Sequence, residues 1–335
     1  MRANDSSNTQ SLHYIVRSGI AGGIAGCVAK TVVAPLDRVK ILFQASSPDF
    51  QKYAGSWSGA IRAIGQIYTE NGARGLLQGH SATLLRIFPY AAIKYMAYDQ
   101  VELILMPTRE SQTNLRRFSA GAISGMISVV FTYPLELIRV RMAFSTRSSV
   151  PPQGVPYRPS FVLAMSEIYR EGSSIPKASP SVIPETTASL FSRFPILKFY
   201  RGFTVTMIGM IPYAGTSFLA WGFLRSHFIP PPPPSSDSRA RSKSNPVTNL
   251  IIGAASGAVA QTVSYPFEII RRRMQVGGLT RPDRWLHWGE TVRAIWNSRG
   301  WRGFYVGLGI GYLKIVPMTG VSFAVWQWSK GILGV

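Results

Sequence analysis

The sequence is short of charge, of acidic residues in particular, and of cysteine. Asp, Glu, Lys and Arg together make up 15% of its 335 residues, against roughly 25% in a typical soluble domain. Because solubility and disorder both depend on charge, this shortage argues against a soluble globule and against a disordered chain. The single cysteine excludes an internal disulfide, and the four histidines show no metal-ligand spacing. We therefore expect neither a disulfide framework nor a bound metal.

The few charges that are present are mostly positive. Lys and Arg number 36 against 15 Asp and Glu, which leaves a formal charge of +21. Nucleic acid, a membrane surface or a polyanionic small substrate could each explain this excess. Residues 1–11 have no signal-peptide hydrophobic stretch, and a long apolar run begins near residue 12. The composition favours a membrane protein that retains its first helix.

A proline motif recurs three times in the chain. It reads PLDRVK at 35–40, PLELIR at 134–139 and PFEIIR at 266–271, with an acid two residues and a base five residues after each proline. Glycines stand thirteen and nine residues before each proline: Gly22, Gly26, Gly121, Gly125, Gly253 and Gly257. This small-x-x-x-small spacing, repeated in one phase, predicts three membrane helices that can pack closely.

Each unit continues with a second proline ten residues after a glycine. These pairs are Gly79 and Pro89, Gly202 and Pro212, and Gly307 and Pro317. The middle unit is longer, and its Ser- and Pro-rich residues 173–198 are predicted to be an irregular inserted loop. Residues 230–246, with a proline run and a basic polar tract, are predicted to be an exposed linker. We therefore divide the chain into a tail, 1–11, and three repeats, 12–108, 109–229 and 247–335.

The predicted fold is an all-α membrane protein with six transmembrane helices. Their length suits a bilayer, and they are expected near 12–43, 81–104, 115–144, 203–228, 247–276 and 308–333. A short amphipathic helix is expected between the long helices of each unit, near 56–69, 159–171 and 288–297. An even number of spans places both termini on one side.

The proline motifs place six charges at the ends of three membrane helices: Asp37, Lys40, Glu136, Arg139, Glu268 and Arg271. Each would cost about 2.5–3.5 kcal/mol if it stood alone at the bilayer centre, so we expect them to face the bundle interior and pair. Two interpretations stay open. The pairs form a structural ring, or they close one end of a central cavity and open during transport.

The threefold motif, with the glycine and proline of the second helices, resembles the mitochondrial carrier family over about residues 12–335. The resemblance implies a pseudo-threefold bundle of three tandem repeats whose short amphipathic helices lie on the matrix side. It also implies a central substrate site open alternately to cytosol and matrix, and no cofactor. We expect a monomeric multi-pass protein of the mitochondrial inner membrane, in contact with lipid such as cardiolipin.

The resemblance also assigns roles to the charged residues. Neighbouring repeats pair at the matrix gate in the family, which implies Asp37 with Arg139, Glu136 with Arg271, and Glu268 with Lys40. Glutamine braces are implied at Gln44 and Gln275, where the middle repeat has Ala143. The opposite, cytoplasmic network of charged pairs is incomplete, because several of its positions lack the acid or base of the family. The residues assigned to it are Asp99, Arg225, Gln327 and Lys330. We therefore expect a weak cytoplasmic gate.

A substrate without threefold symmetry must be recognised by residues at positions where the three repeats differ. Four bases stand at such positions: Lys30, Arg86, Lys94 and Lys314. Arg86, Tyr90 and Lys94 are four residues apart and form one stripe along a helix. Their place in mid-helix favours a cavity role over snorkelling to the interface. A cationic cavity of this kind suits phosphates.

Gly209 occupies the position at which the other repeats have Arg86 and Lys314, and Met210 follows it. A glycine on a cavity wall lets a flat ring approach the backbone, and a methionine offers an adaptable apolar surface. The pair resembles the adenine-contact motif of nucleotide carriers in the family. The stretches GLLQGHSATLLRIFPYAAIKYMAYD and GMIPYAGTSF resemble its coenzyme A carriers, most closely the fungal type.

The sequence thus predicts a carrier of coenzyme A or a close adenine-phosphate relative. An ADP/ATP or adenosine-3′,5′-bisphosphate exchanger is the alternative of the same class, and a non-transporting structural membrane protein is the alternative of another class. A nucleic-acid-binding protein is disfavoured because the bases are spread over loops and helices without a recognition signature. An enzyme is disfavoured because no catalytic constellation is present. The stretch GGIAGCVAKT is no phosphate loop, since Ala29 precedes Lys30.

Overall fold

The computed structural model describes residues 3–108, 112–146, 160–171, 194–228, 246–280 and 286–333. Throughout these ranges the chain is helical, without strands. Long helices occupy the positions expected from the repeats: α1 Ala3–Gln44, α3 His80–Leu105, α4 Asn114–Phe144, α7 Phe203–Phe228, α8 Pro246–Thr280, and α10 Leu308–Leu313 followed by α11 Ile315–Leu333. The prediction of an all-α bundle is confirmed.

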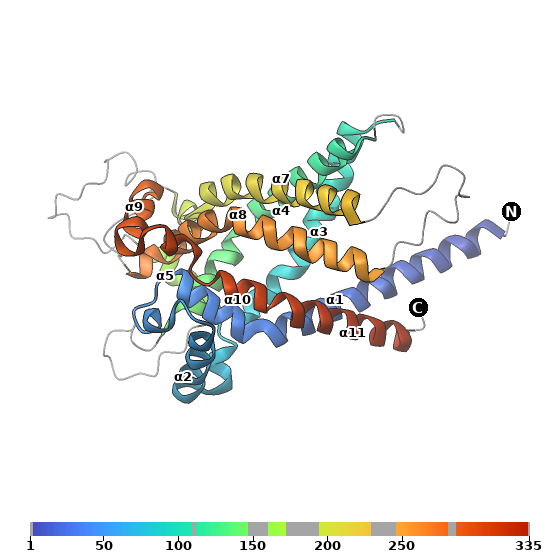
Figure 1. Cartoon of the computed structure of the whole chain (residues 1–335). Coiled ribbons are helices and arrows are strands. Elements are labelled where there is room, and N and C mark those ends of the chain that lie inside the picture. Colours follow the sequence, from blue (N-terminus) through green and yellow to red (C-terminus); the bar gives the residue numbers. More distant parts are fainter. Residues whose placement is uncertain are drawn as a thin grey trace.

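The long helices pack in three pairs, α3 with α4, α7 with α8, and α1 with α11. Figure 1 shows the pairs gathered at the end where the short helices lie and diverging toward the end where both chain termini lie. We call these the closed end and the open end. A bundle of this form encloses a space that narrows toward the closed end.

The short helices lie at the closed end (Figure 1). They are α2 Trp57–Leu76, α5 Phe161–Arg170 and α9 Trp288–Arg299, joined by the 3-10 helices η1 Gln51–Tyr53, η4 Pro195–Tyr200 and η6 Gly300–Tyr305. Each short helix buries an isoleucine, Ile67, Ile168 or Ile295, in one of three apolar clusters. The expected amphipathic helices are present, and the apolar core is repeated threefold at this end.

A left-handed glycine begins the second long helix of each unit. Gly79, Gly202 and Gly307 have φ values of +83°, +79° and +83°, a conformation that residues with a side chain rarely adopt. An added Cβ at Gly79 would also lie 2.9 Å from the carbonyl oxygen of Arg139. The conformation and the close approach explain why glycine recurs ten residues before each second proline.

The glycines before the first prolines do not pack helices closely in this structure, so that expectation is wrong here. A Cβ added at Gly22, Gly26, Gly121, Gly253 or Gly257 would meet nothing within 4 Å. The reason is that these glycines lie toward the open end, where the helix pairs diverge. Several of them line the interior space instead.

Two boundaries differ from the expectation. Helix α1 begins at Ala3, within the expected tail, and continues directly into the first repeat. Residues 173–193 of the expected insert and residues 230–245 of the expected linker lie outside the described part of the chain, as does Gly172. The last residues assigned to the insert are ordered. Lys198 in η4 is buried and donates a 2.9 Å hydrogen bond to the carbonyl oxygen of Tyr169, so η4 is the counterpart of η6 and belongs to the repeat.

Five described stretches are long and apolar enough to cross a membrane: Gly19–Gln44, Leu115–Phe144, Pro195–Phe228, Thr248–Thr280 and Trp288–Ile332. Helix α3 has the length, at 26 residues, but carries four charged side chains, among them Arg86 and Lys94. Large apolar side chains point outward, such as Phe88 of α3 at 80% exposure and Val316 of α11 at 76%. The bundle therefore presents an apolar exterior, and two of the expected substrate bases lie on α3.

Candidate functional site

The three proline-motif helices bring their charges together at the closed end. Arg139 Nη2 lies 3.2 Å from Asp37 Oδ2, and Lys40 Nζ lies 3.0 Å from Glu268 Oε1. Arg271 forms the third pair with Glu136. Every expected pair is thus present, and each joins two different repeats. Because the acid and base of each motif lie one helical turn apart and the helices meet here, the charges form a continuous floor below the interior space.

The floor contains bases that the motif does not supply. Arg86 Nη1 lies 2.9 Å from Glu136 Oε2, and Arg272 Nη1 lies 3.2 Å from Glu136 Oε1. Lys314 Nζ lies 2.9 Å from Asp37 Oδ1. Two of the expected substrate bases, one from α3 and one from the break between α10 and α11, are therefore in direct contact with gate carboxylates.

Lys30 completes this basic group, since it interacts electrostatically with Asp37, Lys314, Arg139 and Arg86. The floor then holds seven basic side chains against three carboxylates: Lys30, Lys40, Arg86, Arg139, Arg271, Arg272 and Lys314 with Asp37, Glu136 and Glu268. Four positive charges are in excess. Sequence reasoning missed Arg272, although the run Arg271-Arg272-Arg273 was visible.

The two brace glutamines each bind a tyrosine of another repeat. Gln44 Nε2 donates to Tyr265 Oη at 3.0 Å, and Gln275 Nε2 donates to Tyr133 Oη at 3.2 Å. The tyrosines in turn donate to the carbonyl oxygens of Val306 and Arg201. These tyrosines precede the motif prolines and were not foreseen as partners. The pairs tie α1 to α8 and α8 to α4 just beneath the ion pairs.

The third brace is missing on both sides of its interface. Ala143 stands in the glutamine position of α4, and Ala34 stands in the tyrosine position of α1. Main-chain contacts replace it: Arg38 Nε donates to the carbonyl oxygen of Ala143 at 3.2 Å, and Gln78 Nε2 donates to that of Met142 at 2.6 Å. The α1–α4 interface is thus held by a different set of bonds from the other two.

Replacing Gln275 by alanine should destabilise the closed end. Gln275 is fully buried, and its amide both donates to Tyr133 and accepts from Arg272 Nη1 at 2.9 Å. Removing a buried hydrogen-bond partner costs about 1–3 kcal/mol. We expect a lower melting temperature of the detergent-solubilised protein, with a smaller loss for Gln51→Ala as control, because Gln51 is exposed. An unchanged melting temperature for Gln275→Ala would contradict the brace.

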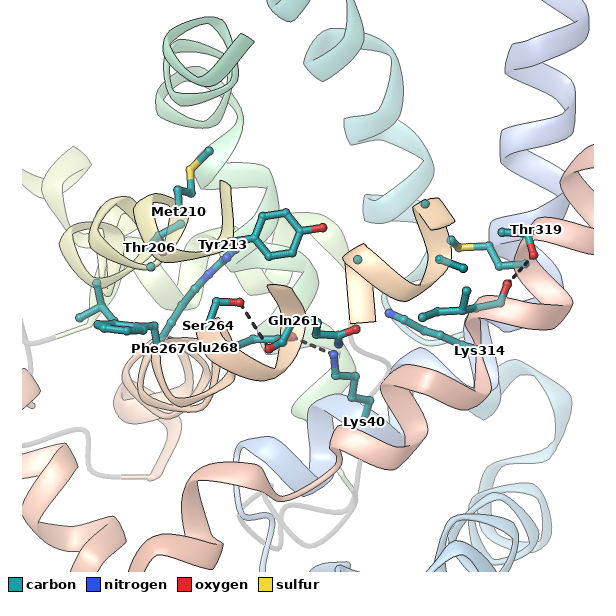
Figure 2. Close-up of a pocket in the computed structure, with 18 of the residues that line it drawn as sticks. Lys40, Thr206, Met210, Tyr213, Gln261, Ser264, Phe267, Glu268, Lys314 and Thr319 are labelled. Atoms are coloured by element: carbon teal, nitrogen blue, oxygen red, sulfur yellow. Dashed lines mark hydrogen bonds and ion pairs between the residues drawn. The ribbon is translucent and has the colours of Figure 1, made fainter. Parts of the chain in front are cut away.

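A cavity of about 640 Å³ lies directly above the floor, between α7, α8 and the α10–α11 helix. Figure 2 shows Lys40 and Lys314 on one side of it, with Met210, Tyr213 and Phe267 on the other. Gln261 and Ser264 of α8 supply neutral polar groups between them. The cavity therefore combines a cationic side with an apolar and aromatic side.

Gly209 lines this cavity, but its α-carbon faces Phe267. A Cβ at this position would lie 2.8 Å from Phe267 Cβ, closer than side chains approach one another. The glycine is therefore required by the packing of α7 against α8, a role that the sequence did not indicate. The ring of Phe267, where the other repeats have leucine, covers the backbone patch that was expected to be bare.

A second cavity, of about 600 Å³, lies between α3, α4, α7 and α8. Tyr90 and Lys94 line this cavity and not the lower one, whereas Met210 and Tyr213 line both. Of the expected substrate residues, Gly209, Met210 and Lys314 line the lower cavity and Tyr90, Lys94 and Met210 line the second, whereas Lys30 and Arg86 line neither. Within α3, Arg86 lies over the ring of Tyr90 at 5.5 Å. It thus contacts both a residue that lines the second cavity and Glu136 of the floor.

The expected cytoplasmic network lies at the open end. Arg225 is placed over the Trp221 ring at 4.9 Å, and Lys330 over the Trp326 ring at 4.6 Å. Each base thus contacts an aromatic ring of its own helix. Asp99 and Gln327 belong to the helix pairs α3–α4 and α1–α11, which diverge at this end (Figure 1).

No group of three or more His, Cys, Asp or Glu side chains among the described residues is arranged to hold a metal ion. The polar chemistry of the interior is instead that of bases, amides and hydroxyls around ion pairs. Such a set binds and releases anions, and it offers charges that can be separated and paired again as helices move.

Comparison with known proteins agrees with this architecture. The family model described as "Mitochondrial carrier protein" matches residues 12–109, 110–231 and 242–334. "Uncharacterized mitochondrial carrier C17H9.08" of Schizosaccharomyces pombe is 44% identical over 97% of this chain and 96% of its own length. "Mitochondrial carrier protein LEU5" of Saccharomyces cerevisiae is 42% identical, over 98% and 94%, and "Solute carrier family 25 member 16" of mouse is 37% identical, over 95% and 88%. With three matched repeats, a helical bundle of paired spans and ion pairs between all three repeats, the chain belongs to the mitochondrial carrier family.

Proposed function

We propose that this carrier moves coenzyme A, or a close adenine-phosphate relative, across the mitochondrial inner membrane by alternating access. The observation that carries the proposal is the excess of four positive charges at the cavity floor. Coenzyme A carries about four negative charges near neutral pH, since its terminal 3′-phosphate adds close to two. A neutral or zwitterionic metabolite would leave this excess uncompensated.

The cavity shape supports an adenine-containing anion. Its 640 Å³ falls within the range of about 300–1,000 Å³ that small-molecule sites occupy. Met210, Tyr213 and Phe267 offer apolar and aromatic surface opposite Lys40 and Lys314 (Figure 2). Such an arrangement binds a flat ring on one side and phosphates on the other.

Ion pairing at the floor suggests how binding leads to opening. Arg86 contacts Glu136, and Lys314 contacts Asp37, at the closed end. Substrate phosphates that bind Arg86 and Lys314 compete with these carboxylates and weaken the contacts that hold the three repeats together. Binding energy is thereby used to shift the population toward the state open to the matrix.

A ligand panel on the detergent-solubilised protein tests the substrate class. A ligand at free concentration c that binds only the folded state stabilises it by RT ln(1 + c/Kd), so at equal concentration the ligand that binds more tightly raises the melting temperature more. We expect coenzyme A to stabilise the carrier more than ADP, ATP, adenosine-3′,5′-bisphosphate or pyrophosphate at equal concentration. A larger shift with ADP or ATP would support a nucleotide exchanger, and no shift with any of them would support a carrier structure that does not transport.

Met210→Ala tests the adenine contact without disturbing the packing of Gly209. A sulfur-aromatic contact contributes roughly 0.3–1.5 kcal/mol, so we expect a severalfold weaker apparent affinity for coenzyme A. Pyrophosphate, which has no ring, should affect the wild type and the variant alike. Met318→Ala, on the opposite wall of the same cavity, serves as the matched control. Equal losses for both variants would remove Met210 from the adenine site.

A further inference from the structure

The second cavity, between α3, α4, α7 and α8 and called the upper cavity from here on, is lined by two basic side chains that do not belong to the floor. Lys94 of α3 and Arg117 of α4 both line it. Lys94 is exposed and has no hydrogen-bond or ion-pair partner within the described residues. Arg117 is exposed as well and donates one hydrogen bond, to Gln112 Oε1 at 2.6 Å. An unpaired ammonium in the middle of a membrane helix is costly unless it faces water or an anion.

Both bases break the threefold symmetry of the chain at positions that face the interior. Ser217 and Ser322 stand where Lys94 stands in the other repeats, and Ser18 and Asn249 stand where Arg117 stands. The two differences fall on the same helix pair, α3–α4, which forms one wall of the upper cavity. Since only one wall is basic at this level, the cavity is suited to one anionic group in one orientation.

The upper bases are separated from the floor by a definite distance. Lys94 follows Arg86 by eight residues on one helix, which places their α-carbons about 12 Å apart at 1.5 Å per residue. Met210 and Tyr213 line both cavities, so a single extended ligand can occupy both. Because both side chains are long and flexible, this spacing allows them to reach two separate phosphate groups, at the 3′ and 5′ positions of one ribose.

We propose that Lys94 and Arg117 form an upper subsite for a ribose phosphate monoester, bound while the diphosphate of the same ligand lies on the basic floor. This inference rests on the proposed function and makes it more specific, because it selects nucleotides that carry a second, separate phosphate. Coenzyme A has that phosphate, and dephospho-coenzyme A lacks it. An ordinary nucleoside diphosphate or triphosphate has no phosphate monoester at the 3′ position of its ribose and therefore lacks the group that the upper subsite binds.

The test compares coenzyme A with dephospho-coenzyme A in competition with labelled coenzyme A, using the full chain in proteoliposomes of zwitterionic lipid. The wild type should bind coenzyme A about tenfold more tightly, because a charge-assisted hydrogen bond to a monoester is lost in dephospho-coenzyme A. Lys94→Gln and Arg117→Gln should each reduce this preference severalfold, and the double variant should abolish it. Apparent affinity for dephospho-coenzyme A should stay the same in all variants.

Arg116→Gln is the matched control, since Arg116 is adjacent on α4 but does not line the cavity and should leave the preference intact. Equal losses for both ligands in the double variant would overturn the subsite, because the bases would then act only through general attraction. No preference in the wild type would overturn it as well, while competition by coenzyme A would still support the proposed function. Absence of specific binding and uptake of labelled coenzyme A, with uptake of labelled ATP, would instead refute the coenzyme A assignment itself.

Discussion

Neutralising Arg86 as glutamine should weaken the apparent affinity for coenzyme A by tenfold or more. A hydrogen bond between charged groups contributes roughly 1.5–3 kcal/mol, and the Arg86 guanidinium belongs to the basic floor, where it lies against Glu136. The fold should survive, because Arg271 and Arg272 still compensate Glu136. Uptake of labelled coenzyme A by proteoliposomes over a range of concentrations measures the loss.

Arg62→Gln is a suitable control for the Arg86 variant. Arg62 is exposed on the short helix α2, where it donates to Ser58 Oγ at 3.1 Å, and it lies outside the interior. We expect transport by Arg62→Gln to match that of the wild type. Wild-type kinetics for Arg86→Gln would show that the central base of the site does not contact the substrate.

Reversing Glu268 as Glu268→Lys should abolish transport, and adding Lys40→Glu should restore a measurable part of it. The single change brings two ammonium groups together at a buried position near Lys314, and breaking a buried ion pair costs about 3–5 kcal/mol. The double change recreates the pair with its direction reversed. Initial uptake rates should rise at least tenfold from the single to the double variant.

Lys40 and Glu268 are the best pair for such an exchange. Glu136 is shared by three guanidinium groups and Asp37 by two bases, whereas Glu268 takes its direct ion pair from Lys40. A charge reversal at Glu136 would leave Arg86 and Arg272 facing a new positive charge. If the Lys40 and Glu268 double variant folds, by its melting temperature, yet transports no better than the single variant, the pair is not a gate.

The repetition of the chain made much of this architecture predictable. Three copies of one motif show which helices carry charges and at which end, so the positions of the long and short helices followed from spacing. The pairing of Asp37 with Arg139 followed from the resemblance to the family. Left-handed glycines at Gly79, Gly202 and Gly307 could be located for the same reason. A single copy of the motif would have supported none of these predictions.

What could not be predicted depends on how side chains meet across helix pairs. The contact of Phe267 with Gly209 and the binding of Tyr133 by Gln275 arise where two helices cross, and neither partner marks the other in sequence. The attachment of Arg86 to Glu136 is of the same kind. Because of these contacts, the observed site differs from the predicted one. The sequence predicted one basic cluster, whereas the structure has a floor of shared ion pairs with two cavities above it.

The direct test of the central claim is uptake of labelled coenzyme A by proteoliposomes containing the purified carrier. We expect time-dependent, saturable uptake that exceeds uptake of labelled ADP and ATP and is absent from liposomes containing Glu268→Lys. Uptake of ADP or ATP without uptake of coenzyme A would contradict the assignment of substrate. Equal uptake by the wild type and Glu268→Lys would contradict the role given to the ion pairs at the floor.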